Sequence, residues 1–236
     1  MKRLIAVLLI LASGLTHAET HEEIVQRAFD AVETRIRDHW AFTRVETTAD
    51  GVYVATHDPR REQPWELLTV DGREPSKDER EEFVSEREAE LGDDNDNENE
   101  EENRSMVSPG SVELIDETDE RWQFNFSPKA DSEEEQAFME AVEGRLEVAK
   151  DGHYVRAVSL RNLKTIKPGK GTKLEVFDTR LEFAPSPDGS AVLPVFVYAK
   201  VKGRALLVIG IDEEQTVQFS DYRRVIDRDG RPFPAL

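Results

Sequence analysis

The chain has 236 residues, no cysteine and a formal net charge of −19. This length accommodates one large domain or two small ones, and the missing cysteine excludes both disulfide bonds and a lipid-modified amino-terminal cysteine. The negative charge is local, because residues 78–103 hold fourteen acids against two arginines, a net of −12 that leaves −7 for the rest of the chain. The acidity therefore belongs to one segment and not to the fold.

The amino terminus has the three parts of a secretory signal peptide. Residues 1–3 include Lys and Arg, residues 4–15 are almost all apolar, and Ala18 is a small residue at the predicted cut. The apolar run of about twelve residues is too short to span a bilayer, which needs roughly twenty. We predict that residues 1–18 are removed, and that the mature chain is periplasmic or secreted and has no transmembrane anchor.

The next segments change from a helical to a strand period. In residues 21–37 apolar side chains recur every fourth position, which predicts an amphipathic helix. From Trp40 to Thr69 the period is two, which predicts three strands. The pair Asp50-Gly51 indicates a hairpin between the first two strands, and Asp-Gly recurs at four later places. Those places are Asp71-Gly72, Asp151-Gly152, Asp188-Gly189 and Asp229-Gly230.

A second helix is expected over residues 76–91, where Ser76 and Glu79 have the spacing of a capping box. The polar, low-complexity residues 93–105 bury too little apolar surface to offset their ordering entropy, so we predict disorder there. Acids in this tract alternate as calcium ligands do, but the positions of the turn glycine and the bidentate glutamate hold other residues. Helix and tract together form an insert at about residues 76–105. A third, short helix is expected over residues 131–142.

After Gly144 the chain reads as strands almost to its end. A tight turn is predicted at residues 200–203, between two of these strands. Repeated hairpin turns and the lack of long crossovers predict an antiparallel meander. The expected strands are 145–149, 153–161, 173–183, 191–200, 203–211 and 214–222.

The strand predicted at 191–200 is apolar on both faces, so each face needs cover. We expect one face to pack on helices and the other to line a cavity, and strict alternation sorts the residues onto the two faces. It puts Val192, Phe196 and Tyr198 on one face and Leu193, Val195 and Val197 on the other.

No motif for catalysis or metal binding stands out. The histidines beyond residue 18 have no His or Cys partner at metal-ligand spacing, and no nucleophile elbow, zinc-protease or phosphate-loop signature occurs. We predict no enzyme activity, no metal and no cofactor. A carboxylate pair hidden among the many acids is the alternative that the sequence leaves open. The four histidines are His21, His39, His57 and His153.

A basic stretch without any acid runs from residue 156 to residue 173. One interpretation is an anionic partner such as lipid headgroups, lipopolysaccharide or cell-wall polymer. The other is a solvated strand and loop. Nucleic acid is not an expected partner for an exported chain of net negative charge. The candidate residues are Arg156, Arg161, Lys164, Lys167, Lys170 and Lys173.

The order of the elements resembles the outer-membrane lipoprotein-sorting (LolA/LolB-like) superfamily. An export signal, a leading helix, a hairpin that begins at Trp40 and a long meander carry the resemblance, over about residues 21–222. Val70-Asp71-Gly72-Arg73 is similar to a strand-turn segment of that family, while the acidic insert after Pro75 departs from it. The resemblance implies an open half-barrel, closed by helices on its concave side, that holds acyl chains.

The predicted fold class is α+β: an antiparallel meander forming an open half-barrel, with an N-terminal helix and one or two further helices covering one face. Residues 19–227 would form a single domain, followed by a tail at 228–236. The expected function is an exported binding or carrier protein, with a hydrophobic groove for a lipid or a lipid-modified protein. A protein-interaction or sensor module that recognises another envelope protein is the alternative. Groove candidates, each also consistent with ordinary core, are Phe124, Phe126, Phe177, Leu181, Phe196, Leu206 and Val208.

Overall fold

The computed structural model of the protein describes residues 19–93, 106–130, 132–169, 172–205, 209–226 and 231. The predicted signal peptide, the tract at 94–105, the Asp229-Gly230 turn and all but one residue of the predicted tail lie outside this part of the chain. Within it, no helix combines the length and the apolar character that a membrane span requires.

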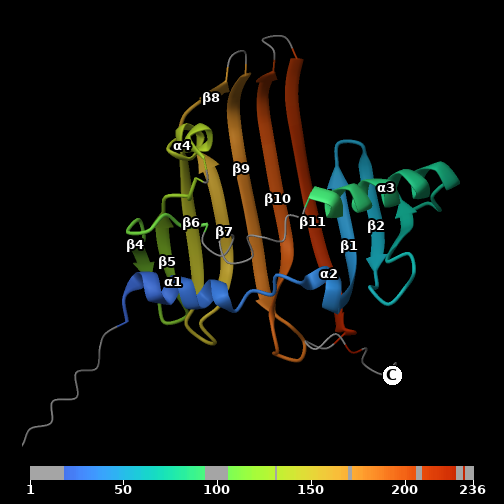
Figure 1. Cartoon of the computed structure of the whole chain (residues 1–236), viewed down its shortest axis with the longest axis horizontal. Helices are drawn as coiled ribbons and strands as arrows, with labels where there is room; N and C mark the ends of the chain where they lie inside the picture. Colours follow the sequence, from blue (N-terminus) through green and yellow to red (C-terminus); the bar gives the residue numbers. More distant parts are fainter. Residues whose placement is uncertain are drawn as a thin grey trace, which may run out of the picture.

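The described strands form one eleven-stranded sheet, and every pairing between them is antiparallel (Figure 1). Their order across the sheet is β3-β2-β1-β11-β10-β9-β7-β6-β5-β4, and β8 pairs with β9 beside this path. The strands are β1 (Trp40–Thr48), β2 (Gly51–His57), β3 (Trp65–Val70), β4 (Glu113–Glu117), β5 (Arg121–Phe126), β6 (Val142–Ala149), β7 (Val155–Asn162), β8 (Ile166–Gly169), β9 (Thr172–Pro185), β10 (Val192–Ala205) and β11 (Ile209–Arg224).

The described helices pack on one face of this sheet, which we call the helix face. α1 contacts β7, α2 contacts β1, α3 contacts β3, and α4 contacts β6 and β8. Figure 1 shows α1 and α3 in front of opposite halves of the sheet. An open antiparallel sheet with helices on one face confirms the predicted α+β half-barrel. The helices are α1 (His21–Asp30), α2 (Ile36–His39), α3 (Lys77–Asp93) and α4 (Glu133–Met139).

α1 ends at Asp30, so the predicted helix over residues 21–37 is too long. The chain leaves the helix because its backbone bonds to Val192 at the start of β10. The Val192 amide donates to the carbonyl of Ala31 at 3.3 Å, and the amide of Glu33 donates to the carbonyl of Val192 at 2.9 Å. A tertiary contact between two distant segments thus overrides the local helical period.

α3 begins at its predicted cap. The amide of Glu79 donates to the hydroxyl of Ser76 at 3.3 Å, and the amide of Ser76 donates to the carboxylate of Glu79 at 2.7 Å. Arg73 adds two contacts to the same carboxylate, at 2.9 and 2.5 Å. These bonds lower the pKa of Glu79 to about 2, the Arg73 contact being the largest cause. The end of β3 is therefore tied to the start of α3.

The turn predicted at residues 200–203 is wrong, because these residues continue β10 and pair on both sides. Lys202 lies opposite Val176 of β9 and opposite Asp212 of β11. Gly203 is not part of a turn. It allows β10 to lie close to β9, since a Cβ at this position would come within 2.2 Å of the Lys173 carbonyl oxygen. The two predicted strands at 203–211 and 214–222 are consequently the end of β10 and a single long β11. β4, β5 and β8 were not among the predicted strands.

The predicted Asp-Gly turns inside the described residues are confirmed. Thr48 pairs with Gly51 at the end of the β1–β2 hairpin. Gly72, Gly152 and Gly189 have φ values of 76°, 79° and 68°, the left-handed conformation that glycine adopts without strain.

Apolar side chains on the helix face form separate clusters. The α1 cluster joins Ile24, Val25 and Ala28 of the helix to buried residues of β5, β6 and β7. The α3 cluster joins Phe83 to the aromatic side chains of β1 and β3. A smaller α4 cluster places Phe138 on Phe177 with ring centroids 5.2 Å apart.

A glycine in the α1 cluster supports a packing prediction. Gly144 lies opposite Phe126, whose ring would meet an added Cβ at 2.5 Å. We expect Gly144→Ala to lower the free energy of unfolding by about 1–3 kcal/mol, because the extra methyl overpacks the core. Urea denaturation measures this loss. The matched control is Gly210→Ala, where an added Cβ meets nothing within 4 Å; equal losses in the two variants would contradict the packing argument.

A buried histidine makes stability depend on pH. His57 is 4% exposed and lies between Phe42 and Trp65, at centroid distances of 4.9 and 4.7 Å. Burial lowers the pKa of His57 below its usual value, and Arg37 lowers it further, against the opposing hydrogen bond to the Trp40 carbonyl.

Because the unfolded chain binds this proton more readily, stability is expected to fall as pH drops below 6.5 towards the folded-state pKa. His57→Phe should lose less stability than the parent chain between pH 7.5 and pH 5.5 in urea denaturation. An unchanged pH dependence would show that folding does not shift the pKa of His57.

Candidate functional site

A row of directly paired side chains crosses the helix face from one half of the sheet to the other. From Val158 on β7 it passes through Leu181, Val197 and Val217 and reaches Glu46 on β1. Val158 is buried beneath α1, and Glu46 is buried on the side of α3. Between these covered ends, Leu181 and Val197 are only partly buried. The row therefore opens in the middle of the sheet.

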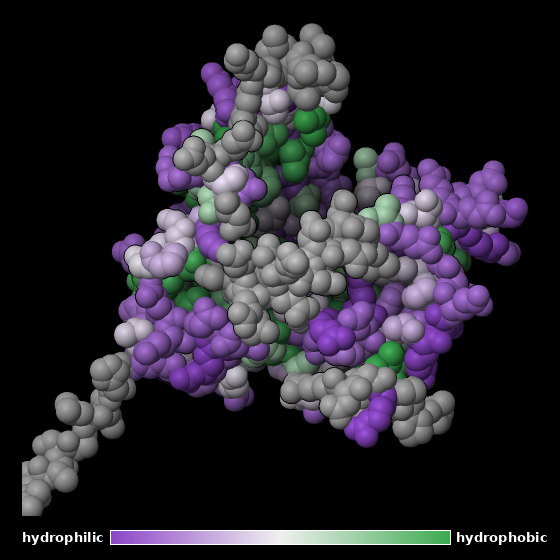
Figure 2. All heavy atoms as spheres, in the orientation of Figure 1, coloured by the Kyte–Doolittle hydropathy of each residue, from purple (hydrophilic) through white to green (hydrophobic). Residues whose placement is uncertain are grey.

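The open part extends along β9 and β10 as a patch of partly buried apolar residues, which we call the central strip. Phe177 pairs with Val201 at one end, Leu181 pairs with Val197 at the other, and Ala199 lies between. The strip spans four residue steps, about 14 Å. Figure 2 views this face and shows hydrophobic surface at its upper centre. Phe177, at one end of the strip, packs against Phe138 of α4, whereas the principal contacts of the described helices are with other strands. The strip is the candidate ligand groove.

A buried ionic cluster flanks the strip on the side of α3. Arg44 and Arg87 both contact one oxygen of Glu46, with Nη2–Oε2 distances of 3.1 and 3.9 Å. The amide of Gln215, which pairs with Ala199 of the strip, donates to the other oxygen. Arg44, Glu46 and Arg87 are at most 9% exposed. Burying these charges costs several kcal/mol per ion, which their mutual contacts must offset.

The predicted groove residues occupy three different settings. Phe177 and Leu181 lie on the central strip. Phe124 and Phe126 are buried in the α1 cluster, at 0% and 4% exposure. Phe196 pairs with Glu182 and Gln218 on the face opposite the helices. Leu206 and Val208 lie outside the described residues.

A β-bulge explains why sequence reasoning missed Val197, Ala199 and Val201. Pro194 lies opposite Phe183 and Phe196 lies opposite Glu182, so Val195 is an extra residue in β10. An extra residue reverses the alternation beyond it. The proline at 194, which is confined to edges and bulges in sheets, was the signal available in the sequence.

Among the described residues, the predicted basic patch does not form one continuous surface. Arg161 pairs with Glu143 at 2.9 Å and Lys173 pairs with Glu175 at 2.8 Å, so acids from neighbouring positions meet these charges. Arg156 lies towards the other end of β7, where it lines a cavity of about 600 Å³ with the turns that join neighbouring strands. Lys164 and Lys167 are exposed near β8, and Lys170 lies outside the described residues.

No metal site is found in the described part of the chain, where no three His, Cys, Asp or Glu side chains are placed to hold an ion. Its four histidines are spread over α1, α2, β2 and the β6–β7 turn. His39 and His57 are buried at 4% exposure each. The chemistry that the helix face offers is burial of apolar surface beside an ionic cluster.

Comparison with known proteins gives a likeness in structure. No protein-family model matches the chain, and no curated protein matches it. The chain is similar to the crystal structure of a LolA superfamily protein from Nitrosomonas europaea, with 11% sequence identity and a TM-score of 0.38, over 90% of this chain and 96% of that one.

The ionic cluster provides a test of what holds α3 on the sheet. Glu46→Gln removes the charge that two buried guanidinium groups share, so we expect a loss of about 3–5 kcal/mol in the free energy of unfolding. Glu143→Gln is the control, since the partners of Glu143 are the half-exposed Arg145 and Arg161, and its loss should not exceed about 1 kcal/mol. Similar losses in urea denaturation would show that burial does not strengthen the dependence on Glu46.

Proposed function

We propose that the protein is an exported binding or carrier protein that holds an acyl chain, of a lipid or of a lipid-modified protein, on the central strip. The observation that supports this most directly is the open middle of the helix face. Cross-strand pairs of partly buried apolar residues lie there between two helix-covered clusters.

The physical basis is burial of apolar surface. A chain lying along β9 and β10 would cover both members of each pair, such as Leu181 with Val197. Each Å² removed from water contributes about 25 cal/mol, so one acyl chain gains several kcal/mol before the costs of ordering. Surfaces of this kind on an otherwise polar protein mark ligand or partner sites.

The proposed location follows from the amino-terminal sequence, whose basic, apolar and small-residue parts are those of a secretory signal. An exported carrier of this kind would take up its ligand outside the cytoplasm. The alternative is a module that recognises another envelope protein, and it is distinguished by what co-purifies: lipid in one case, a protein in the other.

A pair of variants on adjacent residues of β10 tests the proposal. Val197 faces the helix side and Phe196 the opposite side, and both are partly buried. Val197→Glu should abolish lipid loading because it places a charge on the strip, whereas Phe196→Glu should keep it. Native mass spectrometry of protein purified from the periplasm without detergent measures the bound mass.

Circular dichroism shows whether each variant is folded. Loss of loading in folded Phe196→Glu, together with retained loading in folded Val197→Glu, would mean that the lipid binds on the face opposite the helices, which contradicts the proposal. If Val197→Glu does not fold, Ala199→Glu, further along the same strip, takes its place. The proposal would be overturned if the unmutated protein carried no lipid after incubation with phospholipid vesicles.

A further inference from the structure

A hollow of about 300 Å³ lies on the face opposite the helices. Its floor is β7, where the outward side chains of Ala157 and Ser159 are small and the longer Arg161 follows at one end. The flanking strands carry long polar residues at the paired positions, Arg145 on β6 and Arg180 on β9. Strands lie about 4.8 Å apart, so the walls stand roughly 10 Å from each other across β7. The hollow exists because small residues separate two rows of large ones.

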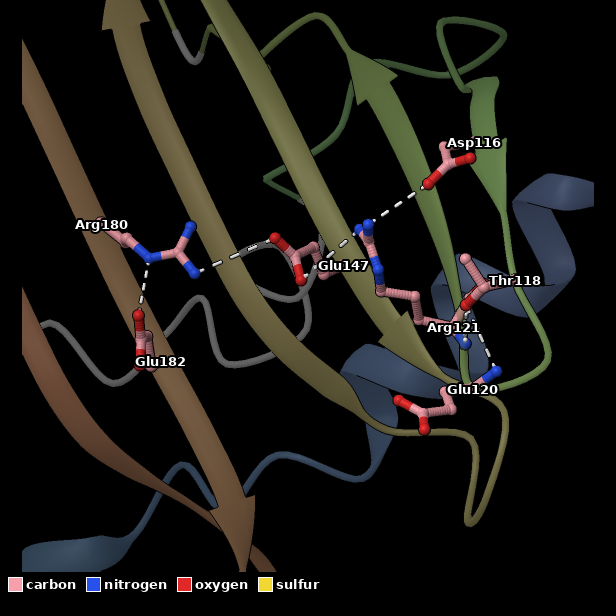
Figure 3. A network of polar contacts seen from close by, with 7 residues as sticks. All are labelled: Asp116, Thr118, Glu120, Arg121, Glu147, Arg180 and Glu182. Atoms are coloured by element: carbon pink, nitrogen blue, oxygen red, sulfur yellow. Dashed lines mark hydrogen bonds and ion pairs between the residues drawn. The ribbon is translucent and has the colours of Figure 1, made fainter.

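A chain of ionic contacts crosses this hollow from β4 to β9 (Figure 3). Asp116 holds Arg121 at 3.2 Å at one end, and Arg180 donates to Glu182 at 2.7 Å at the other. Glu147 stands between them, 3.8 Å from Arg121 and 3.9 Å from Arg180. These two distances exceed hydrogen-bond length, so Glu147 and the two guanidinium groups keep capacity to hydrogen-bond an added polar group.

Other polar groups around the hollow have unused bonding capacity within the described residues. Arg145 Nε is buried without a hydrogen bond and meets Glu143 only as an ion pair at 3.4 Å. The hydroxyl of Ser159, on the floor, makes no hydrogen bond in the described part of the chain. Tyr198 adds an aromatic ring to the lining. Donors, an acceptor, a hydroxyl and a ring surface thus converge on one small space.

The geometry points to a second binding site here, for a saccharide. A sugar hydroxyl both donates and accepts, as the mixture of guanidinium, carboxylate and hydroxyl groups requires. Three arginines and two acidic residues line the hollow. Because the two carboxylates would repel a simple anion, the arginines alone do not make this an anion site. The ring of Tyr198 offers an apolar surface against which the face of a pyranose packs. The site is independent of the central strip, because the sheet separates the two.

Titration of the isotope-labelled full chain with maltotriose and with chitotriose, followed by amide shifts, tests this site. Binding of either sugar in the millimolar range or tighter is expected, with shifts centred on Ala157, Ser159 and Arg180. Ser159→Leu fills the floor and should weaken binding by about tenfold. Ser220→Leu, an outward serine on β11 away from the hollow, should leave the affinity unchanged.

Two results would overturn the inference: no shifts with either sugar, or an unchanged affinity in folded Ser159→Leu. If that variant does not fold, Glu147→Gln replaces it, because it keeps the shape of the wall and removes the charged acceptor. Lipid loading measured in the same samples separates this site from the proposed carrier function. A negative result for the saccharide site leaves the proposed carrier function unaffected, and the reverse also holds.

Discussion

The pairing of β1 with β11 is the constraint on which the rest of the structure depends. These strands lie far apart in the sequence, yet they pair from Trp40↔Arg224 to Thr47↔Thr216 and so join the first three strands to the long meander. The α3 cluster spans this junction, because it combines Trp40 and Phe42 of β1 with partly buried side chains of β11. Tyr222 of β11 donates to the carbonyl of Pro194 at 2.8 Å, and burial raises its pKa. Without this junction, the α3 cluster would lose the side chains that β11 contributes.

The junction also determines which part of the helix face lies between the helices α1 and α3. α1 packs over one half of the sheet and α3 over the other, each on a cluster completed by its own strands. The strands between them, β9 and β10, are long and pair on both sides, so their backbone hydrogen bonds are satisfied without help from a helix. Their apolar side chains are therefore held in a fixed row while they remain only partly buried. A rigid apolar surface of this kind binds a flexible chain at little ordering cost to the protein.

An open sheet has two edges, and both carry the same protective feature. Leu68 in β3 and Ile115 in β4 are extra residues at register shifts, 40% and 42% exposed. Bulges bend an edge strand and interrupt the row of free backbone groups that would template pairing with another chain. The charged outer face, with the polar hollow in its middle, adds to this protection. The protein can thus keep an open sheet in solution while it offers an apolar strip on one face.

The sequence by itself determined the local features of this protein. Alternating periods located β1, β2 and β3, the Asp-Gly pairs located the turns, and Ser76 with Glu79 located the start of α3. These features depend on residues that are close in the sequence, so their conformational preferences can be predicted without knowing the tertiary contacts. The antiparallel meander followed from them, because recurring hairpin turns leave no other connection.

The tertiary structure decided which side chains share a face and where the face is left open. A single extra residue at Val195 reverses the alternation of β10 and exchanges Phe196 for Val197 on the helix face. Gly203 reads as a turn residue but permits close contact between β9 and β10, and Val32 leaves a helical period to meet Val192. In each case the deciding contact joins residues from different elements. Alternation, glycine content and helical period describe one segment at a time, so they carry no information about the neighbour that sets the register.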